Sequence, residues 1–198
     1  MFKRFLLLLI MMVSFTMPAG AISLQELQTL PNFKLVTYEE YPSGSSNHVD
    51  KFYSFINLDS IHIVEYNPPK YVLQGTSYMV FDYANSPFIR ETEMTVYYDI
   101  NYSLANLIHS NLEKQQNSSL VDVISAAENH PGIVAKLKSG GKYKLNGEKW
   151  YTENRSFFTD AEWMGPVGRS RYNENTYNDA DALFKAVYLQ NFDDILVQ

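Results

Sequence analysis

The sequence predicts an α+β fold, and two periodicities in the chain predict it. In the first half, apolar and polar residues alternate, which is typical of half-buried antiparallel strands. In the second half, apolar residues recur every three or four positions, as they do on one face of a helix. We therefore expect an antiparallel β-sheet of about five to seven strands, packed on one face by a C-terminal helix and one or two middle helices.

Five segments rich in aromatic and β-branched residues predict the strands. They span residues 33–38, 52–58, 61–66, 78–83 and 94–100. The break at Asn67-Pro68-Pro69 predicts a turn, because proline fixes φ and has no N–H to donate to a neighbouring strand. Asn85-Ser86-Pro87 predicts a hairpin connection between the last two strands.

Three apolar stripes predict helices in residues 103–115, in residues 119–129 and near the C-terminus. Ser119 and Asp122 have the spacing of an N-terminal cap. The polar residues 115–118 either separate the first two helices or kink a single one. The last stripe consists of Ala180, Leu183, Phe184, Val187 and Tyr188. We expect this helix to begin at a cap formed by Thr176 and Asp179, and to lie on the sheet.

A hairpin is predicted in residues 143–151, because Asn146-Gly147 favours a type I′ turn with positive φ at both positions. A two-residue loop would pair Tyr143 with Trp150 and Leu145 with Glu148. The same register would set Lys144 opposite Lys149. Gly140-Gly141 is expected to form a turn before this hairpin, and residues 154–175 are expected to be irregular.

Residues 1–21 have the layout of a cleavable signal peptide. Lys3 and Arg4 precede eleven almost wholly apolar residues, and Ala19-Gly20-Ala21 supplies the small residues of a cleavage site. A membrane anchor would need about 20 apolar residues, more than this segment has. We therefore expect cleavage after Ala21, a single α+β domain in residues 22–198 without a transmembrane segment, and a secreted protein in the periplasm, at the cell surface or outside the cell.

The composition of the chain argues against some classes of binding partner and some kinds of chemical site. The leader carries two cations and no acid, so the net charge of −6 becomes −8 after cleavage. An acidic chain without a cluster of Lys and Arg argues against nucleic acid as a partner. The chain has no cysteine, which excludes disulfides and thiolate metal sites, and which favours a bacterial source for an exported domain.

Several short segments resemble one family of small exported proteins. They are Phe52-Tyr53-Ser54-Phe55-Ile56-Asn57-Leu58-Asp59-Ser60-Ile61, Asn67-Pro68-Pro69-Lys70-Tyr71, Asn146-Gly147-Glu148-Lys149-Trp150 and Phe184-Lys185-Ala186-Val187-Tyr188. With these, residues 33–192 resemble the surface-adhesin protein E type of domain. The resemblance implies a small α+β sheet domain at the cell surface or in the periplasm, and it transfers no binding residue to this chain.

The sequence predicts no catalytic residue, no metal site and no cofactor. The four histidines lack metal-ligand spacing, and no nucleophile elbow or phosphate-binding loop is present. Four Asn and Asp residues at the start of the last helix could suggest a calcium site: Asn173, Asn175, Asp179 and Asp181. They lack the glycine and the final glutamate of a calcium loop, so helix capping explains them better.

Carboxylates on or beside the predicted strands leave one catalytic alternative open. Asp59, Glu65, Asp82 and Asp99 are the candidates. A glycosidase needs two carboxylates about 5–10 Å apart across a cleft. The competing interpretation is that these side chains face the solvent.

The aromatic content of the chain, with 15 Tyr, 12 Phe and 2 Trp, extends into the irregular segment. Trp163, Arg169 and Arg171 lie there, in a loop longer than about 15 residues, and such loops are often functional. Because Trp, Tyr and Arg dominate contact surfaces, these three are the predicted binding residues. The alternative is that the loop folds back and buries its aromatic side chains.

Together these observations predict an exported, non-enzymatic bacterial envelope or surface protein that binds an unknown protein or glycan, in the manner of an adhesin. The alternative is a small secreted hydrolase that uses a carboxylate pair. A converging pair with a raised pKa would favour the hydrolase. The oligomeric state is not indicated by the sequence.

Overall fold

The computed structural model describes residues 22–42, 49–113, 119, 121–122, 125, 132–150, 162–168 and 174–197. Its helices and strands are α2 (Leu24–Thr29), β1 (Phe33–Pro42), β2 (Val49–Asn67), β3 (Lys70–Asp82), β4 (Phe88–Asp99), η1 (Ile100–Tyr102), α3 (Leu104–Glu113), β5 (Ile133–Tyr143), β6 (Glu162–Pro166), α5 (Glu174–Tyr188) and η3 (Phe192–Asp194). The predicted α+β class is confirmed.

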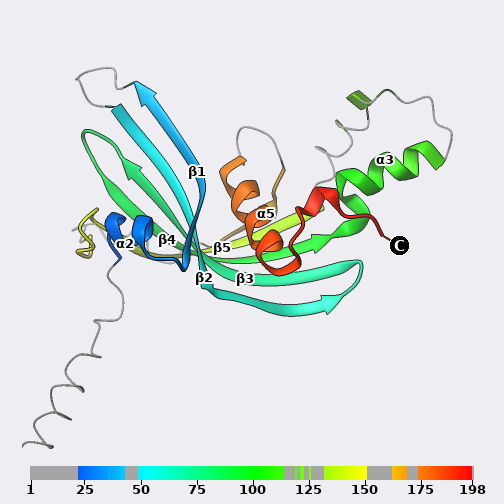
Figure 1. The fold of residues 1–198 in the computed structure, drawn as a ribbon, viewed down its shortest axis with the longest axis horizontal. Coiled ribbons are helices and arrows are strands. Elements are labelled where there is room, and N and C mark those ends of the chain that lie inside the picture. The colour runs from blue at the N-terminus through cyan, green and yellow to red at the C-terminus, as the bar shows by residue number, and fades with distance from the viewer. Residues whose placement is uncertain are drawn as a thin grey trace, which may run out of the picture.

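The six strands form one antiparallel sheet in the order β1-β2-β3-β4-β5-β6, so each strand pairs with its neighbour in the sequence. The sheet is strongly curved, and α5 lies in its concave face (Figure 1). β2 joins two segments that the sequence predicts as separate strands. The reason is a local irregularity between Asn57 and His62, where the Ser60 hydroxyl accepts the Thr76 N–H at 2.8 Å and keeps β2 attached to β3.

The main core lies between α5 and the concave face. Ala180, Leu183 and Phe184 of the predicted stripe are fully buried, so this stripe is confirmed. The Tyr98 hydroxyl of β4 donates to the Ala180 carbonyl at 2.7 Å. A side chain at Gly75 would meet Leu183 Cδ2 at 2.6 Å, so the helix sits as close to β3 as a glycine permits.

A second, smaller core lies on the opposite face, under α2. Leu27 of α2 packs there with Phe55, Val80 and Ile89. Ser23 and Glu26 close the start of α2 with a reciprocal capping box. The sequence pattern does not predict this helix, because six residues are too few to display a helical period.

The middle helices are partly described. α3 confirms the first of them, and it contacts η1 and η3. The Ser119 side chain accepts the Asp122 N–H at 3.3 Å, which confirms the predicted cap, while most of residues 119–129 lies outside the described residues. Within the described ranges, no helix is long and apolar enough to cross a membrane.

The hairpin after β5 corrects the predicted turn. Gly147 has a φ of 90°, but Asn146 does not have a positive φ. The Gly147 N–H donates to the Lys144 carbonyl, and the Lys144 N–H donates to the Glu148 carbonyl. This pattern is a type I turn followed by a glycine bulge rather than a type I′ turn.

This turn changes the predicted pairs. Tyr143 pairs with Lys149, so the predicted Tyr143–Trp150 and Leu145–Glu148 pairs are wrong. Lys144 forms an ion pair with Glu148 at 2.6 Å instead of facing Lys149. The extra bulge residue therefore removes the like-charge contact that the two-residue loop would impose.

Three further expectations are wrong. Gly140-Gly141 lies inside β5, at a bulge, and not in a turn. The Tyr143 ring covers Gly141, so a side chain at this position would meet the phenol oxygen at 2.1 Å. The segment expected to be irregular contains β6, which has too few residues to show a period of two. α5 begins at Glu174, before the predicted cap, so Asp179 lies inside the helix.

Candidate functional site

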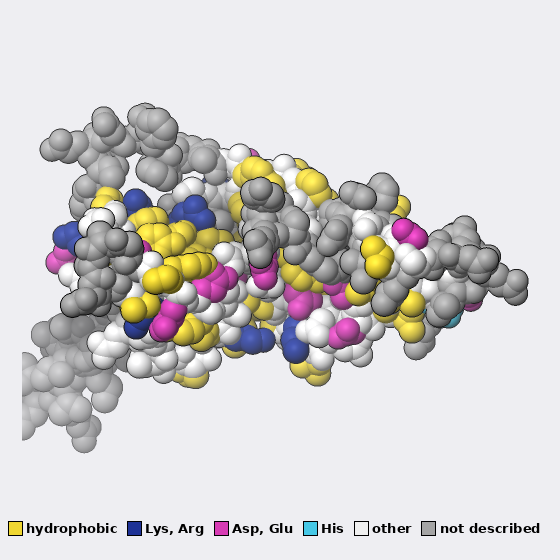
Figure 2. All heavy atoms as spheres, turned by 90° about the horizontal axis from the view of Figure 1, so that it is seen from above, with side chains coloured by type: hydrophobic (Ala, Val, Ile, Leu, Met, Phe, Trp, Pro, Cys, Tyr) yellow, Lys and Arg dark blue, Asp and Glu magenta, His cyan; other side chains and the backbone are white. Residues whose placement is uncertain are grey.

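Four aromatic rings form a row across the concave face, at the strand ends that α5 leaves uncovered. We call Phe52, Phe81, Phe88 and Trp150 the aromatic row. Register sets the first three opposite one another on β2, β3 and β4. The centroids of consecutive rings lie 5.3, 4.6 and 6.2 Å apart. Viewed from above, hydrophobic side chains with Lys and Arg side chains beside them gather over this part of the molecule (Figure 2).

Two cations lie against the aromatic row. The Lys142 Nζ is 4.0 Å from the centroid of the Phe88 ring and 4.7 Å from that of Trp150. The Arg90 guanidinium lies 5.7 Å from the centroid of Phe81. Such contacts are favourable, because the face of an aromatic ring carries partial negative charge. The rings therefore hold both cations in place at the surface of the sheet.

The two cations also face each other. Arg90 and Lys142 are a direct cross-strand pair between β4 and β5. Burial and the neighbouring Arg90 both lower the pKa of Lys142, and burial lowers the pKa of Arg90. The Asp179 carboxyl has the opposite effect on Arg90 and raises its pKa.

A buried polar cluster adjoins the aromatic row beneath α5. It consists of Ser54, Ser77, Arg90 and Asp179, from β2, β3, β4 and α5. Asp179 is fully buried, and Ser54 Oγ donates to its Oδ1 at 2.6 Å. Burial raises its pKa to about 7, against the opposing effects of the two serines and of Arg90.

Several polar atoms of this cluster have no partner within the described part of the chain: Ser77 Oγ, Arg90 Nε and Asp179 Oδ2. The Ser77 hydroxyl is close enough to lower the pKa of Asp179, but it makes no hydrogen bond of ordinary geometry. Unpaired buried polar atoms are uncommon in folded proteins. Because several such atoms lie together here, we take the cluster as part of a candidate functional site.

The cluster is poorly suited to nucleophilic catalysis. Ser54 and Asp179 are both 0% exposed, so a substrate cannot reach the hydroxyl beside the carboxyl group. The groups that shift the pKa of Asp179 are hydroxyls and a guanidinium, not a second carboxylate. What the arrangement can do is hold one proton beneath α5 and fix Arg90 beside the aromatic row.

The predicted binding residues lie elsewhere or are not described. Trp163 is in β6 opposite Leu137, on the face that carries α5, and it is 42% exposed with its ring over Gly165. Arg169 and Arg171 lie outside the described residues. The aromatic row and the cation pair were not predicted, although the alternation in Phe52-Tyr53-Ser54 was visible in the sequence.

The predicted carboxylates are spread over the sheet. Asp82 and Asp99 lie beside opposite ends of β3, which are roughly 40 Å apart for an extended strand of this length. Glu65 and Asp99 approach more closely, because both line one hollow of about 410 Å³ with Lys70, Tyr97 and Tyr102. One oxygen of Asp99 accepts the Asn101 N–H at 3.1 Å, as a helix cap.

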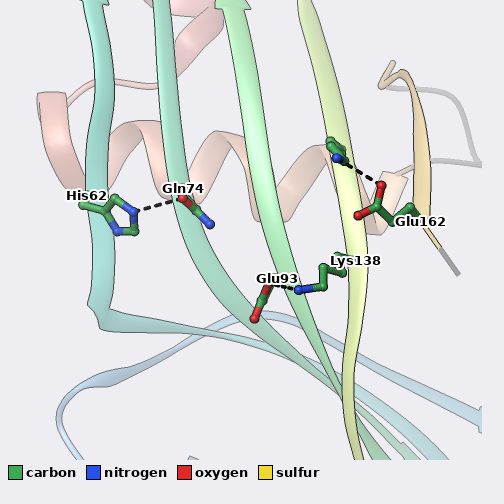
Figure 3. Close-up of polar contacts among 6 residues, drawn as sticks. His62, Gln74, Glu93, Lys138 and Glu162 are labelled. Carbon is green, nitrogen blue, oxygen red and sulfur yellow. Dashed lines mark hydrogen bonds and ion pairs between the residues drawn. The ribbon is translucent and has the colours of Figure 1, made fainter. Parts of the chain in front are cut away.

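The open face of the sheet, opposite α5, carries polar side chains in cross-strand pairs (Figure 3). His62 Nε2 lies 3.0 Å from Gln74 Oε1, and Lys138 pairs with Glu93 at 3.3 Å. Lys136 pairs with Glu162 at 3.0 Å. Exposed pairs of this kind contribute little to stability and leave little net charge for recognition.

A further groove of about 520 Å³ runs between the end of α5 and the first two strands. It is lined by Lys34, Leu58, Ile61, Lys185, Ala186, Val187 and Leu189. Among the described residues that line this groove there is no buried polar cluster of the kind that adjoins the aromatic row. Within the described ranges, no group of three or more His, Asp or Glu side chains is placed to hold a metal ion.

Comparison with known proteins places no relative beside this chain: no protein family, no curated protein and no solved structure matches it.

Proposed function

We propose that the chain is an exported, non-enzymatic binding domain of the bacterial envelope or cell surface, and that its ligand lies on the aromatic row. The observation that carries this proposal is the row itself, four rings on a concave face of which Phe81, Phe88 and Trp150 contact a cation. Binding sites are typically concave and apolar, with a few placed polar groups. Aromatic residues and arginine also carry much of the binding energy at such surfaces.

Two observations favour binding over the hydrolase alternative. The carboxyl group with the raised pKa, Asp179, is buried and has no carboxylate partner among the groups that shift its pKa. Glu65 and Asp99 share a hollow, but one oxygen of Asp99 accepts a hydrogen bond as a helix cap. A hydrolase would therefore have to use that hollow. Hydrolysis of a glycan by the wild type, lost in Glu65→Gln, would replace the binding proposal with the alternative.

A panel of immobilised glycans and envelope or host surface proteins tests the binding surface. We expect Trp150→Ala to weaken binding at least tenfold, because it removes one end of the aromatic row. Tyr97→Ala is the matched control, since Tyr97 is a half-exposed aromatic side chain on the opposite face. Equal losses for the two variants would contradict the proposed surface.

The predicted binding residues of the irregular segment form a separate arm of this test. If Trp163→Ala combined with Arg169→Ala abolishes binding while Trp150→Ala leaves it intact, the ligand lies on that segment and not on the aromatic row. Thermal unfolding of each variant shows whether a loss of binding is a loss of the fold.

Export is tested on the full chain expressed in bacterial cells. We expect the exported protein to begin at Ile22, because signal peptidase requires small residues at positions such as Ala19 and Ala21. Mass spectrometry of the intact protein from the periplasm and the medium measures this. An exported protein that retains Met1, or a protein found only inside the cell, would contradict the proposed localisation.

A further inference from the structure

The groove beside the C-terminal end of α5 is a second concave site, separate from the aromatic row. Along β2, Phe52 of the aromatic row and Leu58 of the groove are six residues apart, which is roughly 20 Å in an extended strand. The volume of the groove, about 520 Å³, lies within the range of roughly 300–1,000 Å³ that is usual for small-ligand sites. The groove can therefore hold a ligand that does not contact the aromatic row.

Most of the side chains that line the groove are apolar. Leu58 and Ile61 come from β2, and Ala186, Val187 and Leu189 come from the last turn of α5 and the residue after it. Leu58 is 37% exposed and Leu189 is 84% exposed. Apolar side chains that gather around a groove are typical of binding surfaces, whereas single exposed ones are common on any protein.

The backbone of Leu189 is unusual for a leucine. Its N–H donates to the Lys185 carbonyl at 2.9 Å, and its φ is 61°. This left-handed conformation is typical of glycine at the end of a helix, because a side chain is strained there. The leucine side chain therefore costs stability without being buried, which is consistent with a role in binding.

Two lysines line the same groove, Lys34 from β1 and Lys185 from α5, and no acid is among its described lining residues. Neither lysine forms an ion pair within the described part of the chain, whereas Lys138 on the open face pairs with a glutamate at 3.3 Å. The acid one turn before Lys185 is Asp181, which accepts the Phe192 N–H at 2.7 Å. The groove therefore combines an apolar lining with two cations.

We propose that this groove binds a free fatty acid, with its alkyl chain on the apolar lining and its carboxylate at Lys34 and Lys185. Burial removes the chain from water, and ammonium groups form charge-assisted hydrogen bonds with a carboxylate. An anionic membrane is typically bound by a cluster of about four to eight Lys and Arg on a surface, not by two lysines in a groove. The inference does not depend on the ligand of the aromatic row.

Laurate and dodecyltrimethylammonium are matched probes, because their chains are similar in length and their head groups have opposite charge. Calorimetric titration of the protein, with each probe kept below its micelle concentration, gives both affinities. We expect the cationic probe to bind at least tenfold more weakly than laurate. Octanoate, with a shorter chain, is also expected to bind at least tenfold more weakly, because each buried methylene strengthens binding roughly fourfold.

Three lysine variants test the position of the carboxylate. Lys34→Gln and Lys185→Gln are each expected to weaken laurate binding at least fivefold. Lys138→Gln is the matched control and should change the affinity less than twofold, because Lys138 lies on the open face and is paired with Glu93. Unfolding midpoints of the three variants establish that the fold is retained.

Leu189→Gly separates binding from folding. Glycine adopts a φ of 61° without strain, so the unfolding midpoint should not decrease. Laurate binding should nevertheless weaken at least threefold, because a large apolar side chain of the groove is lost.

Several results would overturn this inference. Equal affinities for laurate and the cationic probe would exclude a role for the lysines, as would laurate binding that neither Lys34→Gln nor Lys185→Gln weakens. Tighter binding of dodecyl phosphate than of laurate would exclude the carboxylate class. Binding to phosphatidylglycerol vesicles that requires Lys185, without binding of monomeric laurate, would make the groove a membrane contact. A dimer in solution that Leu189→Gly dissociates, again without laurate binding, would make it an interface between copies.

Discussion

Replacing Asp179 with asparagine is expected to stabilise the protein at pH 8, by up to about 4 kcal/mol. Burial raises the pKa of Asp179 from its ordinary value of 3.8 to about 7. Each pKa unit corresponds to about 1.4 kcal/mol between the two protonation states. Asparagine is neutral, and its amide can accept from Ser54 through oxygen and donate to the unpartnered Ser77 hydroxyl through nitrogen.

The same shift fixes the direction of the pH dependence. Because the folded protein keeps the Asp179 proton to higher pH than the unfolded chain, the contribution of this residue is most favourable below pH 4. That contribution decreases as the pH rises from about 4 to about 7 and is constant above that. Urea unfolding at several pH values should therefore show a slope in the wild type that Asp179→Asn reduces.

Asp59→Asn is the control for this experiment, since Asp59 is an exposed acid on β2. We expect it to leave both the stability at pH 8 and the slope with pH almost unchanged. If Asp179→Asn destabilised the protein at pH 8, the buried carboxylate would be a net favourable partner of Arg90 rather than a strained group. The description of the polar cluster would then be wrong.

Replacing Phe184 with alanine is expected to lower the free energy of unfolding by about 3–5 kcal/mol, the usual cost of removing a buried phenylalanine. Phe184 is fully buried, and its ring contacts those of Tyr98 at 4.8 Å and Tyr188 at 4.6 Å. It also meets Phe192 at 5.7 Å. Its loss opens a cavity between α5 and the sheet that these rings cannot close.

Denaturant unfolding of Phe184→Ala measures this cost, and Tyr66→Ala is the matched aromatic control. Tyr66 is 65% exposed, so its removal should cost less than about 1 kcal/mol. A cost for Phe184→Ala no larger than that of the control would mean that α5 does not rest on the concave face through this residue.

The fold was predictable where the spacing of apolar residues identifies the buried face of an element. The stripe around Leu183 and Phe184 predicted which face of the last helix meets the sheet, and both residues are fully buried. Periodicity failed for β6, which is short, and for α2, which has fewer than two turns. It also missed the continuity of β2, which depends on a hydrogen bond from β3 to a serine hydroxyl.

The candidate site was not predictable, because it depends on the register between strands and on how deeply each side chain is buried. Arg90 meets Lys142 only because a bulge at Gly140-Gly141 shifts β5 against β4. The predicted type I′ turn also placed Trp150 opposite Tyr143 instead of beside Phe88. The spacing predicts a cap that includes Asp179, because a short pattern does not distinguish the start of a helix from a position one turn further in.

The central claim, that the ligand lies on the aromatic row, is tested most directly by the two tryptophans of the chain. Trp150 belongs to the row, and Trp163 lies in β6. In a titration with a ligand identified on the panel of glycans and surface proteins, followed by ¹H–¹⁵N spectra and assigned with Trp163→Phe, the indole signal of Trp150 should shift until saturation while that of Trp163 stays in place. A saturable shift of Trp163 alone would contradict the account and move the ligand to the segment around β6.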